Sequence, residues 1–325
     1  MSLGRLGLIQ AGQPSKKCPT LAEMTADATA TAADIVEGKT AYARGEKLTG
    51  TLVPVTKIDV AAEGIKFAYS TFEEVPEVFD FSNVEDANNM FNSCTVLTIM
   101  PKINWNSLLV ARYMFSDCSK LDLELPEIIP LVTDLYSAFA NCSKKNISGF
   151  SVPQCKNAWY LFQLSSAISI GSISLPVCTT LQAAFYNCKE LTTIEEINSP
   201  LVSTYQNMFN ECNSLESIGK LTFDNCNNAV NMFKGCSALS SIGDIIFLHT
   251  ALSLADSPNI DEDTLNLFGT FANAAGESGV APLKSLGLPA AALTFNTTAQ
   301  TYLETEGLIA KLTDENWTIN FADSM

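Results

Sequence analysis

The ten cysteines are the residues of this chain with the most reactive side chains. Cysteine can form disulfides, bind zinc or act as a nucleophile. No C-x-x-C pair occurs in the sequence, and its single histidine cannot complete the usual zinc-finger ligand set. Nine of the cysteines stand at two fixed positions of a repeat described below. Because free cysteine packs as a small apolar group, we expect reduced thiols in a core.

Other candidates for catalysis are His249 and the acidic pair Glu195 and Glu196. Nothing in the sequence pairs His249 with a serine or cysteine, as nucleophilic catalysis requires. Adjacent residues on a strand point to opposite faces, so the two glutamates would not converge on one glycosidic bond. No phosphate-binding loop, G-x-S-x-G or G-x-G-x-x-G motif is present. We predict no enzymatic activity, no cofactor and no metal site, and we interpret the acidic run 261–263 as a helix start.

The cysteines belong to a repeat that is clearest in two segments. NMFNECNSLESIGKL at 207–221 returns 24 residues later as NMFKGCSALSSIGDI at 231–245. Phenylalanine recurs every 23 or 24 residues, at Phe91, Phe115, Phe139, Phe162, Phe185, Phe209 and Phe233. Three residues after each comes cysteine, at Cys94, Cys118, Cys142, Cys188, Cys212 and Cys236, with Ser165 as the exception. So regular a period predicts a solenoid, in which each copy is one rung and each position forms a column.

Two kinds of element are expected within each rung. Ala87, Met90, Phe91 and Cys94 have i, i+3, i+4, i+7 spacing, which predicts a short helical turn facing the core. The L-x-x-I-x-x-I/L segment that follows is too short for another helix, and we interpret it as an extended strand or arc. Strands of successive rungs would pair in parallel about 4.8 Å apart.

The pattern F-x-x-C-x-x-L-x-x-I, preceded by Met or Ala, resembles the BspA-like class of leucine-rich repeats. The match covers Val84 to Ile245, about half of the chain. The resemblance implies an α/β fold: a right-handed leucine-rich repeat solenoid with parallel strands and short helical turns. It also implies a cell-surface or virion protein that binds other molecules and catalyses nothing. Ser165 and the shortened third and fourth copies depart from the pattern, so we expect local bends there.

Three regions are predicted, covering residues 1–57, 58–250 and 251–325. In the first, 20–33 is nearly low-complexity, and the segments on either side of Arg44-Gly45-Glu46 predict a small hairpin. Residues 29–54 resemble modules near the N-termini of bacteriophage tail and fibre proteins, which implies attachment or trimerisation and a possible homo-oligomer. A flexible spacer with one marginal hairpin is the alternative.

The segments flanking the repeats are expected to close its ends. Residues 65–72 and 75–81 predict strands of an irregular first rung or cap. After the repeats we expect a helix that begins near Asp261, a strand at Leu283–Leu288, a helix over 299–311 and a final strand at Trp317–Phe321. Gly307 is a misfit that divides the second helix.

Charge and hydropathy exclude several partners. The chain has 35 acidic and 19 basic residues and a formal charge of −16. A phosphate backbone would be repelled, so we predict no nucleic-acid binding. The sequence contains no run of 18 apolar residues, so we predict no membrane insertion. The first residues lack the pattern of a signal peptide, and the resemblance, not a leader, suggests an extracellular, cell-surface or virion location.

Binding is the function that the pattern favours, because a solenoid offers an extended surface whose outward residues vary while the core columns stay constant. Exposed aromatic residues flanked by polar groups suit carbohydrate stacking or protein contacts. The candidate ligand-binding residues are Trp105, Tyr113, Tyr136, Trp159, Tyr160, Glu195, Glu196 and Lys220. The partner would be a protein or glycan on a host or another cell. Two alternatives stay open: the aromatic residues merely cover gaps between rungs, or the chain is a structural element of a fibre or surface layer.

Overall fold

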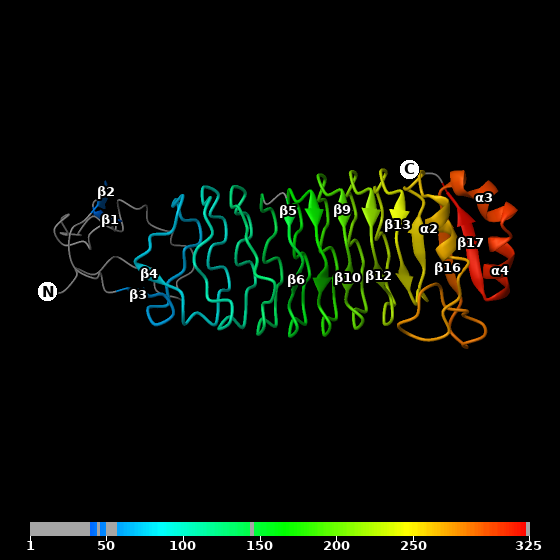
Figure 1. Cartoon of the computed structure of the whole chain (residues 1–325), viewed down its shortest axis with the longest axis horizontal. Helices are drawn as coiled ribbons and strands as arrows, with labels where there is room; N and C mark the ends of the chain where they lie inside the picture. Colours follow the sequence, from blue (N-terminus) through cyan, green and yellow to red (C-terminus); the bar gives the residue numbers. More distant parts are fainter. Residues whose placement is uncertain (1–39, 44–45, 50–56, 144–145, 323–325) are drawn as a thin grey trace.

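The described residues from Lys57 onward form one elongated stack of coils. The computed structural model describes residues 40–43, 46–49, 57–143 and 146–322. It is a parallel-strand β-solenoid of about 11 turns with little helix. Figure 1 shows the coils lying side by side along one long axis, with the helices of the C-terminal region at the far end. The predicted repeat solenoid is therefore confirmed.

Two five-stranded parallel sheets run along part of the stack, and each of five successive rungs contributes one short strand to each sheet. In register, Ile197 pairs with Ile173 of the preceding rung and with Leu221 of the next. The first sheet contains β5 (Asn146–Ile147), β7 (Ser169–Ile170), β9 (Thr193–Ile194), β11 (Ser217–Ile218) and β13 (Ser241–Ile242). The second contains β6 (Phe150–Ser151), β8 (Ile173–Ser174), β10 (Ile197–Asn198), β12 (Leu221–Thr222) and β14 (Ile245–Ile246). The two strands of each rung correspond to the predicted extended arc.

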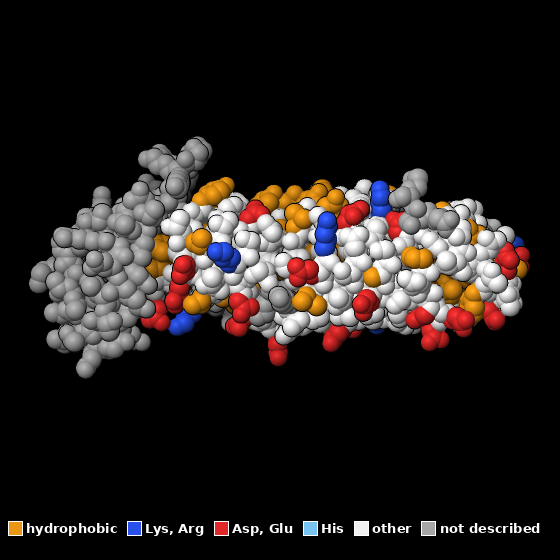
Figure 2. All heavy atoms as spheres, turned by 90° about the horizontal axis from the view of Figure 1, so that it is seen from above, with side chains coloured by type: hydrophobic (Ala, Val, Ile, Leu, Met, Phe, Trp, Pro, Cys, Tyr) orange, Lys and Arg blue, Asp and Glu red, His pale blue; other side chains and the backbone are white. Residues whose placement is uncertain are grey.

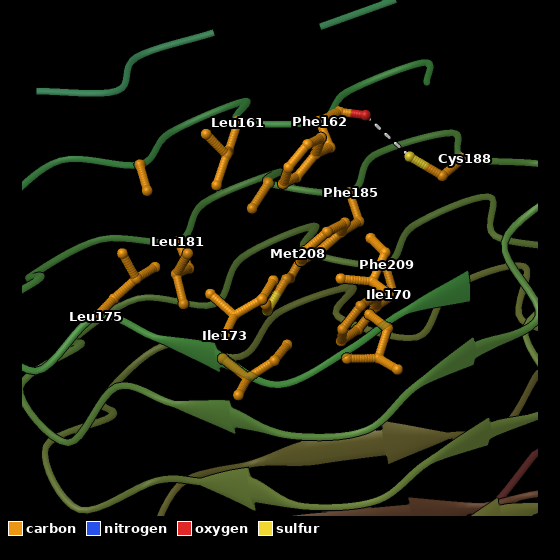
Figure 3. Close-up of a cluster of buried hydrophobic side chains, with 14 of the residues drawn as sticks. Leu161, Phe162, Ile170, Ile173, Leu175, Leu181, Phe185, Cys188, Met208 and Phe209 are labelled. Carbon is orange, nitrogen blue, oxygen red and sulfur yellow. Dashed lines mark hydrogen bonds between the residues drawn. The ribbon is translucent and has the colours of Figure 1, made fainter. Parts of the chain in front are cut away.

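The phenylalanine column forms the axis of the core. All seven predicted rings are buried, and each stacks on the next with centroids 5.1 to 6.4 Å apart and planes within 26°. Figure 3 shows Phe162, Phe185 and Phe209 one behind another among aliphatic side chains from both sheets. Phe67 adds an eighth ring, stacked 5.4 Å from Phe91, which the sequence pattern did not reveal. The rungs therefore share one continuous interior.

The cysteine column completes the hydrogen bonding of the phenylalanine carbonyls. The Phe91 carbonyl accepts from the Cys94 amide at 3.2 Å and from the Cys118 thiol of the next rung at 3.1 Å. The Cys94, Cys142, Cys188, Cys212 and Cys236 thiols make the same contact at 3.0 to 3.2 Å. A carbonyl oxygen has two lone pairs, and a small thiol reaches the second one without leaving the apolar core. All nine described cysteines are free and buried.

The predicted helical turn is wrong. No helix occurs in the described residues between 57 and 246, and the segment is a run of β-turns. Backbone N–H groups of Asn89, Phe91 and Ser93 donate to carbonyls of the next rung at 2.7 to 2.9 Å. These donors are therefore unavailable for the i→i−4 bonds of a helix. Turns two residues before and two after each phenylalanine place a residue at positive φ, such as Asn207 at 57° and Glu211 at 65°.

The ends of the stack differ from the prediction in detail. Of the two strands expected at 65–72 and 75–81, only β4 (Phe79–Asp80) forms, and it pairs in parallel with β3 (Ile58–Asp59). Phe67 belongs instead to the stacked column. Further upstream, β1 (Thr40–Ala43) pairs antiparallel with β2 (Glu46–Thr49). The rest of the predicted 1–57 module, including 20–33, lies outside the described residues.

The C-terminal region continues the parallel pairing. β15 (Leu252–Leu254), β16 (Ala291–Phe295) and β17 (Trp317–Phe321) form a three-stranded sheet. The strand predicted at Leu283–Leu288 is wrong: this segment is a turn closed by Leu288 N–H to the Leu283 carbonyl at 2.7 Å, and β16 supplies the strand. Trp317 is buried, and its indole N–H donates to the Ala281 carbonyl at 2.9 Å.

The helices are short and lie in this same region. α2 (Glu262–Leu267) begins at Asp261, whose carboxylate accepts from the Thr264 amide, as expected for a capped helix start. The helix predicted over 299–311 is divided at Gly307, which adopts φ 69°, into α3 (Gln300–Thr305) and α4 (Leu308–Asp314), preceded by the 3₁₀ turn η2 (Thr297–Ala299). Among the described residues, none of the helices combines the length and apolar character needed to cross a bilayer.

The cysteine column predicts protected thiols. Burial raises the pKa of the Cys142 and Cys236 thiols and raises that of Cys226 to about 11, so all three are neutral at pH 7. We expect the nine buried thiols to react slowly with a thiol reagent in the native protein and at once in denaturant. Fewer than about eight free thiols after denaturation without reductant would show that the core contains disulfides.

The bend between the two strands of a rung predicts a glycine requirement. A Cβ on Gly219 would collide with the Glu195 carbonyl of the preceding rung. Because both atoms belong to paired backbones that cannot separate freely, Gly219→Ala should lower the unfolding free energy by about 1–3 kcal/mol. Thermal unfolding followed by circular dichroism measures the loss. The control Ser217→Ala, on the outward side of β11, should melt close to the parent protein.

Candidate binding surface

The residues first considered for catalysis do not assemble into a catalytic site. The ring Nδ1 of His249 lies 3.0 Å from the Phe247 carbonyl, and its ring lies against that of Phe247. Glu195 accepts from the Ser172 hydroxyl at 3.3 Å, whereas Glu196 pairs with Lys220 at 3.3 Å. The two glutamates thus have separate partners on opposite neighbouring rungs. In the described part of the chain, no three His, Cys, Asp or Glu side chains are grouped as a metal site would require.

The eight candidate binding residues divide into three places. Glu195, Glu196 and Lys220 lie at the bend between the two sheets, where Lys220 and Glu196 form a partly exposed ion pair. Such a pair contributes about 0–1 kcal/mol to folding stability. It gives no reason to single out this bend as a binding site. Trp105 is partly buried and packs against the core, so it serves the fold. The remaining four candidates come together on the surface formed by the β-turns on either side of the phenylalanine column, which we call the turn face.

Tyr113, Tyr136, Trp159 and Tyr160 form what we call the aromatic cluster. Tyr136 occupies its centre, with ring centroids 5.1 Å from Tyr113, 5.7 Å from Trp159 and 5.8 Å from Tyr160. The planes of these three pairs are tilted by 57° to 77°, whereas Trp159 and Tyr160 stack at 5.4 Å and 20°. Three successive rungs supply these rings, and all four are half-buried.

One cation completes the aromatic cluster. The Arg112 guanidinium lies 5.2 Å from the centroid of the Tyr136 ring, within the range of a cation–π contact. Its Nε is also 3.7 Å from a carboxylate oxygen of Asp134. The Asp134 carboxylate in turn accepts from the Tyr136 amide at 2.9 Å. These contacts hold the guanidinium against the central ring from one side.

The backbone under the cluster is unfavourable for bulky residues. Tyr113 and Tyr160 have φ of 51° and 59°, in the left-handed region. In the same column, other rungs place asparagine at Asn89, Asn207 and Asn231. Asparagine tolerates this conformation, whereas an aromatic residue there carries strain. The two tyrosines therefore occupy positions where the fold alone favours a small polar residue.

A buried donor without a partner adds to this cost. The Trp159 indole nitrogen is buried and has no hydrogen-bond partner. The same is true of Asn187 Oδ1 on the following rung. Each such group costs about 1–3 kcal/mol. The position of Trp159 therefore allows the contacts of its ring but leaves its indole N–H without a hydrogen bond.

Exposed leucines occur on the same three rungs as the cluster. Leu109, Leu131 and Leu164 expose 39%, 44% and 45% of their surface. Figure 2 shows hydrophobic side chains gathered along one edge of the N-terminal half of the solenoid, while acidic side chains are frequent along the opposite edge. Sequence reasoning missed these leucines, because outside the repeat columns an exposed leucine has no recognisable signal.

The environment of Tyr136 predicts a measurable pH effect. Partial burial, reinforced by the Tyr113 side chain, raises the pKa of Tyr136 to about 12. A raised pKa favours the neutral form in the folded state, so this stabilisation is present below the ordinary tyrosine pKa near 10 and is lost as the pH approaches 12. Tyr113→Phe should lower the pKa of Tyr136. An ultraviolet titration of tyrosinate, with Tyr136→Phe as the subtraction control, measures it, and an unchanged pKa would contradict the described contact.

Comparisons with known proteins identify the repeat region. A search of curated proteins found no match, and neither did a search of solved structures. A family described as "Mycoplasma protein of unknown function, DUF285" matches residues 64–174 and 179–246, more than half of the chain. The match begins just before Phe67 and ends at β14, so it covers the stacked phenylalanine column described above. The chain therefore belongs to the family described as Mycoplasma protein of unknown function, DUF285.

Proposed function

We propose that this protein is a non-enzymatic binding or adhesion module whose aromatic cluster contacts a molecule on a host or another cell surface. The observation that carries the proposal is the gathering of four aromatic side chains and Arg112 on one face, at the expense of backbone strain and an unpaired indole donor. Unfavourable local conformations that persist in a folded protein concentrate at functional sites.

The alternative, in which the rings only cover gaps between rungs, explains these features less well. The other rungs have asparagine, serine or alanine at the positions of Tyr113 and Tyr160, so the repeat does not require an aromatic residue there. The core does not need aromatic residues at this position for its cover, because Phe91, Phe209 and Phe233 are fully buried in the rungs that have asparagine there. Aromatic side chains are therefore dispensable for closing a rung.

The resemblance to BspA-like leucine-rich repeats supports the same proposal, since it implies a surface protein that binds other molecules. An extracellular, cell-surface or virion location follows from this resemblance and is part of the proposal. The right-handed and leucine-rich character of the repeat is also part of the proposal, because it rests on the same resemblance.

The repeats themselves supply variants that test the proposal without disturbing the fold. Gln182 and Gln206 occupy the column of Trp159, and Asn207 and Asn231 that of Tyr160. We expect Trp159→Gln with Tyr160→Asn to keep or raise the melting temperature, because it removes strain, and to reduce binding of the labelled protein to cultured epithelial cells at least tenfold. Flow cytometry measures the binding.

The matched control for this variant is Glu196→Gln with Lys220→Gln, which changes two partly exposed residues at the bend between the sheets. This control should bind as the parent protein does. Equal binding by the parent and the Trp159→Gln, Tyr160→Asn variant would show that the cluster is not the contact surface.

A structural role in a fibre or surface layer is the second candidate. The observation that favours it is the ladder of backbone hydrogen bonds that joins each rung to the next and stiffens the stack. In that case the segment 1–57, of which residues 29–54 resemble phage tail and fibre modules, would assemble the protein.

Deleting residues 1–57 distinguishes the two functions. If the protein is a structural element, the chain of 325 residues should sediment as an oligomer. The chain without residues 1–57 should sediment as a monomer, because it lacks the assembly module. A binding module should keep its aromatic-dependent attachment to cells in both forms. Analytical ultracentrifugation and the cell-binding measurement read out the two outcomes.

A further inference from the structure

We propose that Tyr113 and Tyr136 form an oxidative cross-linking site, in which a one-electron oxidant joins their two rings as dityrosine. The reaction is a covalent change within the aromatic cluster, so it needs no binding partner. The geometry of the pair, the exposure of both rings and the rings around them each favour it.

The two phenol rings are in contact across successive rungs. Their centroids lie 5.1 Å apart, the shortest ring distance within the cluster. Partial burial and a hydrogen bond with the Tyr113 side chain raise the pKa of Tyr136. Because the hydroxyl is the only polar group of a tyrosine side chain, that bond joins the two hydroxyls. The ring carbons next to the hydroxyls, where phenoxyl radicals couple, are therefore also close together.

Both rings are accessible to an oxidant in solution. Tyr113 and Tyr136 are half-buried, so part of each ring meets solvent while the backbone holds it in place. Tyr205 shows the contrast, since it is buried and its hydroxyl donates to the Thr222 carbonyl at 2.7 Å. Outside the aromatic cluster, the described part of the chain places no two tyrosine rings in contact. The cluster is therefore where coupling within one molecule is expected.

The neighbouring rings direct the oxidation towards this pair. Trp159 and Tyr160 stack on each other at 5.4 Å, and their centroids lie 5.7 and 5.8 Å from that of Tyr136. Over such distances an electron lost from one ring can be replaced from the next, so oxidation at any of them can reach Tyr136. Its ring meets Tyr160 nearly edge to face, at 77°, whereas its hydroxyl contacts that of Tyr113. Tyr113 is therefore the better placed of the two coupling partners.

The reaction balances with hydrogen peroxide as the oxidant and a haem peroxidase as the electron acceptor. Each phenol loses one electron to the oxidised haem and one proton to water. The two phenoxyl radicals form one carbon–carbon bond, and the hydrogen on each coupled carbon then moves to the ring oxygen. One peroxide becomes two waters, and the protein loses two hydrogen atoms. The product joins two rungs covalently at the centre of the cluster.

The test is oxidation of the dilute full-length protein with hydrogen peroxide and a haem peroxidase. We expect the monomer, separated on a denaturing gel, to gain dityrosine fluorescence and to lose the mass of two hydrogen atoms. Trypsin should release residues 113–120 joined to residues 121–144, because Arg112, Lys120 and Lys144 bound these two peptides.

Single substitutions identify the partners. Tyr113→Phe and Tyr136→Phe should each lower the dityrosine yield of the monomer at least about tenfold, because a ring without a hydroxyl forms no phenoxyl radical and the remaining tyrosines are not held in contact. The matched control is Tyr186→Phe, which changes a half-buried tyrosine outside the cluster and should leave the yield unchanged.

Three results would overturn the site: dityrosine found only in cross-linked dimers, an undiminished yield in the Tyr113→Phe monomer, or a cross-link from residues 121–144 to residues 157–189. None of these readouts measures binding to cells. The cross-linking site can therefore fail while the proposed function stands, and the proposed function can fail while the cross-link forms.

Discussion

The structure depends on a ladder of backbone hydrogen bonds that joins each rung to the next along the whole turn face. Alternate residues of one rung donate to the following rung, as Asn89, Phe91 and Ser93 do. Such a ladder requires the turn segment around the phenylalanine to have the same length in every rung. It therefore places equivalent side chains directly above one another, and the phenylalanine rings stack because their backbones are already in register. An insertion in one rung would displace donors and rings together.

The core chemistry follows from that constraint. Once a phenylalanine carbonyl points inward at each rung, it must be satisfied by a donor small enough to share a close-packed interior. The thiol of the next rung performs this task at nearly every level, so the cysteine repeat has a hydrogen-bonding explanation as well as a packing one. Ser165 is instructive, because its hydroxyl lies 3.6 Å from the Cys188 sulfur. The phenylalanine rings of this rung and the one before it, Phe162 and Phe139, remain stacked with centroids 5.4 Å apart.

The surface is free to vary, except at the positions of positive φ. Those columns favour asparagine, so the tyrosines at 113 and 160 stand out against the rest of the repeat. Their strain, the unpaired Trp159 indole and the Arg112 contact all lie within three rungs. A repeat protein can concentrate recognition in a short part of its length because neighbouring rungs, which lack the aromatic residues, already secure the fold.

The period in the sequence was sufficient to predict a stacked solenoid, its phenylalanine axis and its buried free thiols, because each rung must present the same apolar side chain at the same place. The period could not distinguish a helical turn from successive β-turns, since both bury residues at spacings of three and four. That choice belongs to the tertiary structure, where the next rung takes the backbone donors that a helix would have used. Similarly, the sequence marked Tyr113, Tyr136, Trp159 and Tyr160 as outward candidates together with Trp105, Glu195, Glu196 and Lys220. Only the stacking of rungs brought the first four into contact and placed the others elsewhere, because residues some 23 positions apart become neighbours only when the chain has coiled.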